Sequence, residues 1–123
     1  MVLCCHVYEQ CVAEPPEYLQ VAEVGAAGWA PLESIVSNAH VAPLEWRDDA
    51  GEQTPWDGYP TVRLPIADQD LWLADTGTGP QPTKAEVKPR FQLWGLTLDL
   101  VNELMLESGL REKKIDHDLL SRL

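Results

Sequence analysis

The sequence predicts an α+β domain, and three observations indicate this fold class. Two short runs, residues 61–64 and 71–73, are rich in strand-forming residues and lie between prolines and polar turn residues. A longer run, residues 93–104, repeats its apolar residues at helical spacing. The composition, 45% hydrophobic and 24% charged, is typical of globular chains, and 123 residues correspond to one small domain or part of a larger one.

The N-terminal segment, residues 2–13, predicts a β-strand that is apolar on both faces, as in the interior of a covered sheet. Its three cysteines, Cys4, Cys5 and Cys11, are an odd number, which favours reduced thiols over a disulfide framework. With His6 they could form a metal cluster, but adjacent strand residues point to opposite faces, so Cys4 and Cys5 do not readily share one ion. We therefore expect buried, reduced cysteines here.

Short elements are expected after this strand. Pro15 and Pro16 end it, and residues 18–24 predict a second short strand. Residues 25–28 contain two glycines and form a bridge to a short helix, whose first turn holds Pro31. These elements precede the clearest strand signal, at residues 61–64.

Two polar stretches, residues 37–59 and 74–89, predict surface loops, because they are rich in glycine, proline and charged residues. The second stretch is expected to stay mobile. Thr97 is expected to cap the long helix, Gly109 to end it, and residues 115–123 to form a last amphipathic helix. The stripe of the long helix that should face the core comprises Leu93, Leu96, Leu100, Val101 and Leu104.

The charge is strongly acidic, with 20 acidic and 9 basic residues and a formal net charge of −11. Such a surface repels nucleic acid and anionic membranes, so neither is an expected partner. A phosphate-containing ligand would need a metal or a local basic patch to overcome this field. The first residues lack the basic and long apolar regions of a signal peptide or membrane span, which predicts a cytoplasmic protein.

Four segments, in this order, resemble the later part of a Nudix hydrolase domain of the coenzyme A diphosphatase-like branch. The resemblance covers residues 1–106, and residues 107–123 would form a helical tail. The segments are the strand at residues 4–12, Glu23-Val24 with Trp29-Ala30-Pro31-Leu32, Tyr59-Pro60-Thr61-Val62-Arg63-Leu64, and Trp94-Gly95-Leu96-Thr97.

The resemblance implies an incomplete α/β/α sandwich, in which this chain supplies the second half of a mixed sheet and a C-terminal helix. Complete relatives would hydrolyse a nucleoside diphosphate linked to another group, such as a coenzyme A-like or nucleotide-sugar-like compound. They would use magnesium or manganese, held by the glutamates of the signature Gly-x5-Glu-x7-Arg-Glu-U-x-Glu-Glu-x-Gly-U, where U is a bulky aliphatic residue.

That signature is missing from this chain. The nearest stretch keeps Glu103, Glu107 and Gly109, but Asn102 replaces the arginine and Leu106 replaces a glutamate. No catalytic or metal-binding residue and no cofactor is therefore assigned to this chain, its substrate-binding residues are unknown, and it is expected to be inactive alone. Magnesium binding by the two remaining glutamates is the least favoured hypothesis.

Other residues suggest chemistry but have simpler interpretations. Glu23 could act as a base outside the signature, although a strand glutamate is more often paired. Asp68 and Asp70 could bind a metal but lack a third ligand, and the run 116–118, Asp-His-Asp, predicts an exposed surface. Trp94 is expected to anchor the long helix, with base stacking as the alternative. No serine lies in a Gly-x-Ser-x-Gly nucleophile elbow, so none is expected to be a nucleophile; the serines considered are Ser34, Ser37, Ser108 and Ser121.

A second hypothesis is a non-enzymatic acidic interaction domain that binds a protein partner along the exposed edge of the strand at residues 2–13. An in-frame Nudix signature upstream of Met1 would favour the hydrolase hypothesis. A stable monomer without such a segment would favour the interaction domain.

Overall fold

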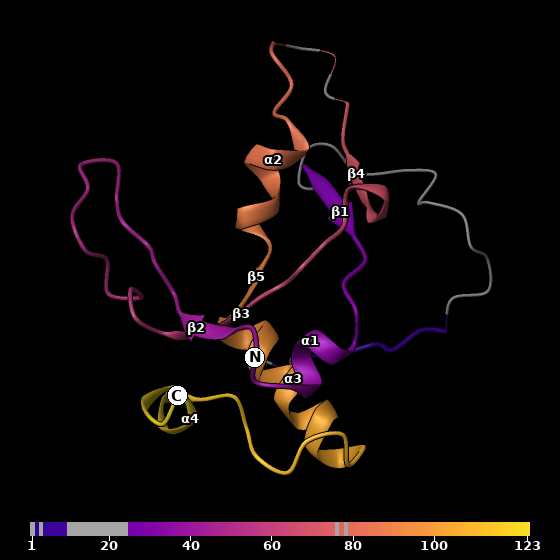
Figure 1. Ribbon diagram of the computed structural model, residues 1–123, viewed down its shortest axis with the longest axis vertical. Helices are drawn as coiled ribbons and strands as arrows, with labels where there is room; N and C mark the ends of the chain where they lie inside the picture. Colours follow the sequence, from indigo (N-terminus) through magenta and orange to yellow (C-terminus); the bar gives the residue numbers. More distant parts are fainter. Residues whose placement is uncertain (1, 3, 10–24, 76, 78) are drawn as a thin grey trace.

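A computed structural model describes residues 2, 4–9, 25–75, 77 and 79–123, and every structural statement below refers to these residues. They form short helices and two small antiparallel sheets, which confirms the α+β class (Figure 1). Within this part of the chain, none of the helices has the length and apolar character needed to cross a membrane.

The larger sheet has three strands in the order β2-β3-β5, with bounds Val41–Pro43, Pro60–Arg63 and Gln92–Leu93. Its centre is Val62, which pairs with Val41 on one side and Leu93 on the other and is fully buried. The strand expected at residues 61–64 is confirmed, one residue earlier.

The loop expected at residues 37–59 is wrong at β2, because Val41 offers an apolar partner to the central strand. The rest of that stretch projects from the body as a long loop (Figure 1). Within this loop Arg47 and Gln53 form an isolated bridge between its two arms.

The smaller sheet joins β1 (Ala26–Gly28) to β4 (Leu71–Leu73), which follows the short helix η1 (Asp68–Asp70). The strand expected at residues 71–73 is confirmed, whereas the bridge expected at residues 25–28 is wrong, because its backbone pairs with β4. Gly28 permits this close approach: an added Cβ would lie 3.0 Å from the Ile66 side chain and 3.2 Å from the Asp70 carbonyl oxygen. The glycine thus marks a contact between two segments rather than a flexible link.

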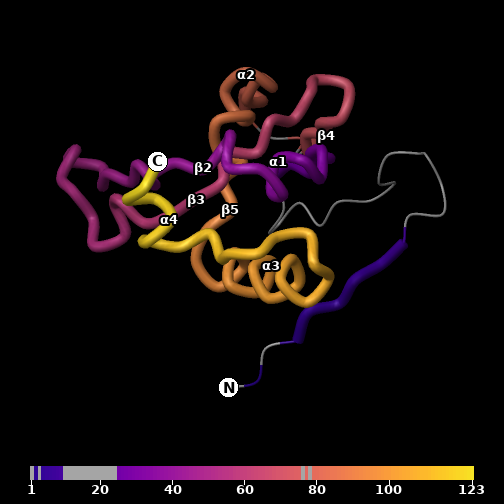
Figure 2. Tube along the Cα trace, turned by 60° about the horizontal axis from the view of Figure 1, so that its bottom comes forward, coloured from indigo at the N-terminus to yellow at the C-terminus, as the bar shows by residue number. Residues whose placement is uncertain are grey.

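One side of the three-stranded sheet is covered by the long helix α3 (Gly95–Glu107), while α4 (His117–Ser121) lies nearby (Figure 2). The buried centre consists of Val62, Leu98 and Ile115. Around it pack half-buried apolar residues from other elements, namely Ile35, Val41, Leu64, Leu93 and Leu119. Ile35 comes from α1 (Glu33–Val36), which confirms the short helix expected after Pro31.

The long helix exists as expected, but its cap and its buried face differ from the prediction. Trp94 occupies the N-cap position and gives no side-chain cap bond, so Thr97 lies inside the first turn. Leu98, Asn102 and Met105 are the buried positions, whereas Leu96, expected in the stripe, is 57% exposed. The sequence pattern did not predict this buried face, because it contains the polar Asn102. Asn102 can be buried since its side chain bonds to the backbone of Ile115. The C-terminal prediction is confirmed: Gly109 adopts a φ of 73° just after the helix.

The stretch 74–89 also contains structure that the prediction missed. A short helix, α2 (Lys84–Val87), continues directly into η2 (Lys88–Arg90). Thr83 begins α2, and its hydroxyl oxygen accepts a hydrogen bond from the Glu86 backbone N–H. Val87 is buried, so the expectation of a surface loop is wrong for this end of the stretch.

The prediction for the N-terminal strand is wrong over residues 2 and 4–9, which are exposed and have no strand assignment. Cys4 and Cys5 are free and exposed instead of buried. An apolar pattern needs neighbouring strands to become a buried strand, and no described strand pairs with these residues. Cys11, Glu23 and the strand expected at residues 18–24 lie outside the described residues.

Candidate functional site

A pocket of about 470 Å³ is lined by residues of β3, β5 and η2 and of the segments beside them. Arg63 and Gln92 are direct cross-strand partners next to the buried pair Val62 and Leu93. Since neighbouring residues on a strand point to opposite faces, these two polar residues lie on the side away from the core. Both line the pocket, together with His40, Glu45, Leu64, Pro65, Ile66, Lys88 and Pro89. We call it the Arg63–Lys88 pocket.

The lining of this pocket contains more cations than acids, unlike the chain as a whole. Its lining includes two permanent cations, Arg63 and Lys88, one acid, Glu45, and His40. The chain as a whole has a formal net charge of −11. The pocket therefore brings two cations together in an acidic chain, where Glu45 and Asp68 balance their charge.

Both cations are held by exposed acidic partners. Arg63 lies 3.5 Å from Glu45, measured between a guanidinium nitrogen and a carboxylate oxygen, and Lys88 contacts the carboxylate of Asp68. Exposed ion pairs of this kind contribute little to stability, because solvent and salt screen them. An incoming anion can therefore replace these partners at small cost.

The Asp68 carboxylate shows the influence of Lys88 directly. The ammonium donates a hydrogen bond to Asp68 and attracts it, and both effects hold the pKa of Asp68 below its ordinary value. Because this pKa is depressed in the folded state, the pair stabilises the fold above the ordinary carboxyl range and loses that effect as the pH falls through the lowered value. Lys84 also donates to the Asp68 carbonyl oxygen, at 2.6 Å.

The side chain of Gln92, a lining residue, contains an unsatisfied acceptor. Its side-chain nitrogen donates to the Pro89 carbonyl oxygen at 3.1 Å, but its Oε1 is buried and has no hydrogen-bond partner among the described residues. A buried polar atom left in this way costs about 1–3 kcal/mol.

The acidic residues considered from the sequence do not assemble into a metal site. Asp68 pairs with Lys88, and Glu103 lies 3.2 Å from Lys114. Glu107 lies one turn after Glu103 and is exposed. Over the described residues, His, Cys, Asp and Glu side chains form no group of three that could hold a metal ion. The residues present do not fit the magnesium or manganese centre that the resemblance implies.

The run 116–118 and the serines have structural roles. Asp116 caps α4 by accepting from the Leu119 N–H at 2.9 Å, the His117 ring lies edge-on to Tyr59, and Asp118 pairs with Arg122. Their exposure agrees with the expected surface. Three serine hydroxyls donate to nearby backbone carbonyls, and that of Ser37 accepts from the Ala39 N–H; the donors are Ser34, Ser108 and Ser121.

Trp94 lies at the start of the long helix, and base stacking by its ring stays a prediction. It begins α3, half-buried, and its ring packs edge-on to Trp46 with centroids 5.0 Å apart. It also lines a second pocket, beside Trp56 and Tyr59.

Sequence reasoning did not find Lys88 and Gln92, because both lie outside the motifs that carry the resemblance. The usable signal was alternation: Arg63 is the polar position directly after the buried Val62, which marks the outer face of the central strand. Lys88 enters the pocket through η2, a helix inside a stretch whose composition indicates a loop.

Comparison of this chain with protein-family models, with curated proteins and with solved structures gave no match.

Proposed function

We propose that this chain is the later part of a Nudix-like domain and that the Arg63–Lys88 pocket binds the diphosphate group of a nucleoside diphosphate compound without hydrolysing it. The observation that carries the proposal is the presence of two cations in one pocket of a strongly acidic chain. Arg63 also belongs to the segment at residues 59–64, one of those that resemble the family.

The charged groups of the pocket have distinct roles in this proposal. The planar guanidinium of Arg63 can donate two parallel hydrogen bonds to one phosphate group, and Lys88 supplies a point charge for the second. Gln92 lines the pocket beside Arg63, its cross-strand partner. Glu45 opposes binding, because its carboxylate competes with phosphate for Arg63.

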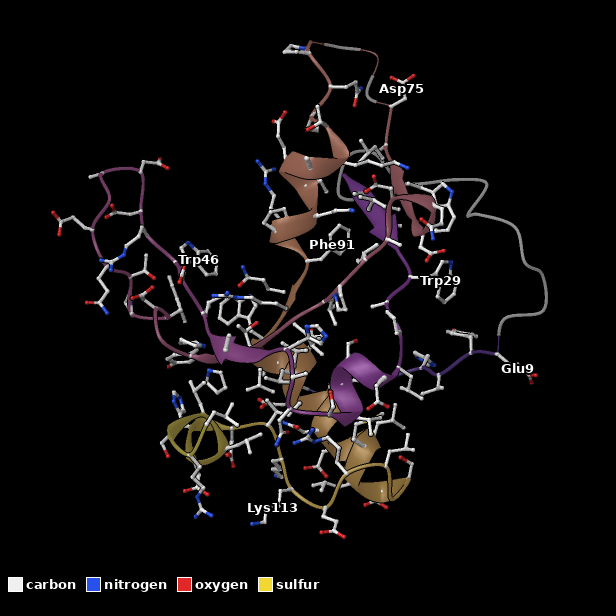
Figure 3. All side chains as sticks on the ribbon, viewed as in Figure 1. Glu9, Trp29, Trp46, Asp75, Phe91 and Lys113 are labelled. Atoms are coloured by element: carbon white, nitrogen blue, oxygen red, sulfur yellow. The ribbon has the colours of Figure 1, made fainter. Side chains whose placement is uncertain are left out.

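Calorimetric titration with ADP at low salt, without metal, tests this assignment. Arg63→Met should weaken ADP binding about tenfold or more, because it removes a charge-assisted pair. Glu45→Gln should strengthen binding, because it removes the competing carboxylate. Lys113→Met is the matched control, because it removes the same charge at an exposed position outside the pocket. Phe91, which directly follows the pocket helix η2, marks the region of the pocket in Figure 3, and Lys113 lies well below it.

The control should keep the wild-type affinity within about twofold, since distant exposed charges are screened by solvent and salt. Equal weakening by the two cation-removing variants would mean that ADP follows the net charge alone. Circular dichroism of each variant confirms that the fold is retained.

The lack of hydrolysis has its own test. The pure chain incubated with ADP-ribose or coenzyme A and magnesium should release no product on chromatography, because Glu103 and Glu107 do not form a metal site. Metal-dependent turnover that Glu103→Gln abolishes would contradict the proposal. An in-frame Nudix signature in the DNA upstream of Met1 would support the family assignment independently.

The interaction-domain hypothesis relied on an exposed strand edge at residues 2–13. Residues 2 and 4–9 have no strand assignment, so the described part of this segment offers no such edge. Protein binding along a sheet edge stays a prediction, and the described residues give no observation that favours it over the anion pocket.

A further inference from the structure

The second pocket lies where α3 begins and has a volume of about 600 Å³. Three aromatic side chains line it, those of Trp56, Tyr59 and Trp94. Its remaining lining comes from the first turns of α3: Gly95, Leu96, Thr97 and Asp99. We call it the aromatic pocket. It shares no lining residue with the Arg63–Lys88 pocket.

The aromatic rings are held by one another. Trp46 packs against Trp56 with ring centroids 5.5 Å apart and against Trp94 at 5.0 Å, nearly perpendicular to it. Tyr59 is held from another side by the edge of His117, at 5.2 Å. The pocket rings therefore have neighbours that fix their positions before a ligand arrives, which lowers the entropic cost of binding.

The exposure of these rings is high for such large apolar groups. Trp46, Trp56 and Tyr59 are 40%, 45% and 41% exposed, although they lie together on one surface. Clustered exposed aromatic residues mark a binding surface more often than single ones do.

The charge at the aromatic pocket is negative. The Asp99 side chain is exposed, no hydrogen bond or ion pair joins its carboxylate to a described residue, and the lining contains neither lysine nor arginine. Aromatic faces attract cations through their quadrupole, and an unpaired carboxylate adds to this attraction. The net charge of −11 acts in the same direction and disfavours an anion.

We propose that the aromatic pocket binds an alkylated ammonium group. Such a cation gains from the rings, from the carboxylate of Asp99 and from the field of the whole chain, whereas a neutral planar base would gain from the rings alone. The N-terminal end of α3, whose first turn lines the pocket, has the positive end of the helix dipole and opposes the cation, so the carboxylate of Asp99 must outweigh it. The group can belong to a free quaternary amine or to a methylated lysine of a peptide, because both present the same chemistry.

Titration followed by the indole N–H signals of the five tryptophans tests the proposal. Choline is the probe, and its neutral isostere 3,3-dimethylbutan-1-ol is the comparison, since the two differ in charge and hardly in shape. Choline should bind about tenfold more tightly than the isostere. The signals of Trp56 and Trp94 should shift, while that of Trp29, on the other side of the molecule from Trp46 (Figure 3), should not.

Asp99→Asn should weaken choline binding about fivefold and leave the affinity for the isostere unchanged. Asp75→Asn is the matched control, because it removes the same charge near the top of the molecule in Figure 3, at a residue that does not line the aromatic pocket. Equal affinities for choline and the isostere, or equal weakening by the two variants, would overturn the proposal. Asp99→Asn should not weaken ADP binding, so failure here is separate from failure at the Arg63–Lys88 pocket.

A short peptide with a trimethylated lysine, compared with the same peptide unmodified, identifies the source. Binding of the methylated peptide tenfold more tightly than choline would assign the cation to a protein partner. Similar affinities would assign it to a small amine. An unmodified peptide that binds as well as the methylated one would contradict a site for alkylated ammonium.

Discussion

Asn102 joins two segments of the chain through a buried amide. Its Nδ2 donates to the Ile115 carbonyl oxygen at 2.9 Å, and its Oδ1 accepts from the Ile115 N–H at 2.8 Å. Both bonds lie in the interior, next to the apolar centre of Val62 and Leu98. One side chain thus satisfies both backbone groups of a core residue in the segment that connects α3 to α4.

Replacement of this amide should be costly. Asn102→Leu leaves two buried backbone groups of Ile115 without partners, so we expect it to lower the free energy of unfolding by about 2–4 kcal/mol. Glu103→Gln is the control on the next residue, where loss of an exposed ion pair with Lys114 should cost less than about 1 kcal/mol. Urea unfolding followed by circular dichroism measures both. Equal stabilities of the two variants would show that the amide bonds contribute little.

Arg111 performs a similar role at the end of α1. Its guanidinium donates to the carbonyl oxygens of Val36 at 2.8 Å and Ser37 at 3.2 Å, and to the side-chain oxygen of Asn38 at 2.8 Å. Partial burial lowers the pKa of Arg111 by desolvation, but the group stays charged at neutral pH. A positive charge at the C-terminal end of a helix also suits the helix dipole.

At the scale of elements, the junction between β5 and α3 depends on one glycine. Trp94 is extended, and Gly95 then adopts a φ of 63° before the helix continues. Only glycine enters this left-handed region without steric cost. The turn places Trp94 against Trp46 and directs Asp99 to the aromatic pocket.

Gly95→Ala should therefore destabilise the chain by about 1–2 kcal/mol, because the added Cβ is strained at positive φ even though it meets no atom within 4 Å. Gly25→Ala is the matched control: its Cβ also meets no atom within 4 Å, and its φ is not in the positive region. Thermal melting compares them. If Gly25→Ala destabilised the chain as much as Gly95→Ala, the backbone angle would not be the cause.

At the scale of the whole molecule, the two sheets have separate packing. The buried cluster of Val62, Leu98 and Ile115 lies beside the three-stranded sheet. Ile66 and Leu71 are buried next to the two-stranded sheet and do not belong to that cluster. Figure 1 shows the same division, with β1, β4 and α2 at one end and α3 and α4 at the other.

This division predicts unequal local stability. The N–H groups of Trp29 and Ala74, bonded to Asp70 and Gly25 in the smaller sheet, should exchange with solvent at least about tenfold faster than that of Arg63, bonded to His40. Hydrogen exchange followed by NMR measures these rates. Equal protection in both sheets would show that the described residues unfold as one cooperative unit.

The sequence by itself determined the elements whose signals are local. Strand-forming residues between prolines specify β3, helical spacing specifies α3, and Gly109 ends that helix, because each signal acts on its own backbone. Tertiary structure decided which segments pair. β1 became a strand only through β4, and β2 only through β3.

The residues of the two candidate pockets were likewise only partly predictable from local sequence. The sequence marked Arg63 and Trp94 as residues of interest, but Lys88 and Gln92 join Arg63, and Trp56 joins Trp94, only after distant segments meet. The N-terminal apolar pattern gave a wrong strand over residues 2 and 4–9 for the same reason: hydrophobic spacing is a local property, whereas burial requires a partner. Local propensity determined which segments form helices and strands. Contacts between distant residues determined which of these segments are buried, paired or exposed at a pocket.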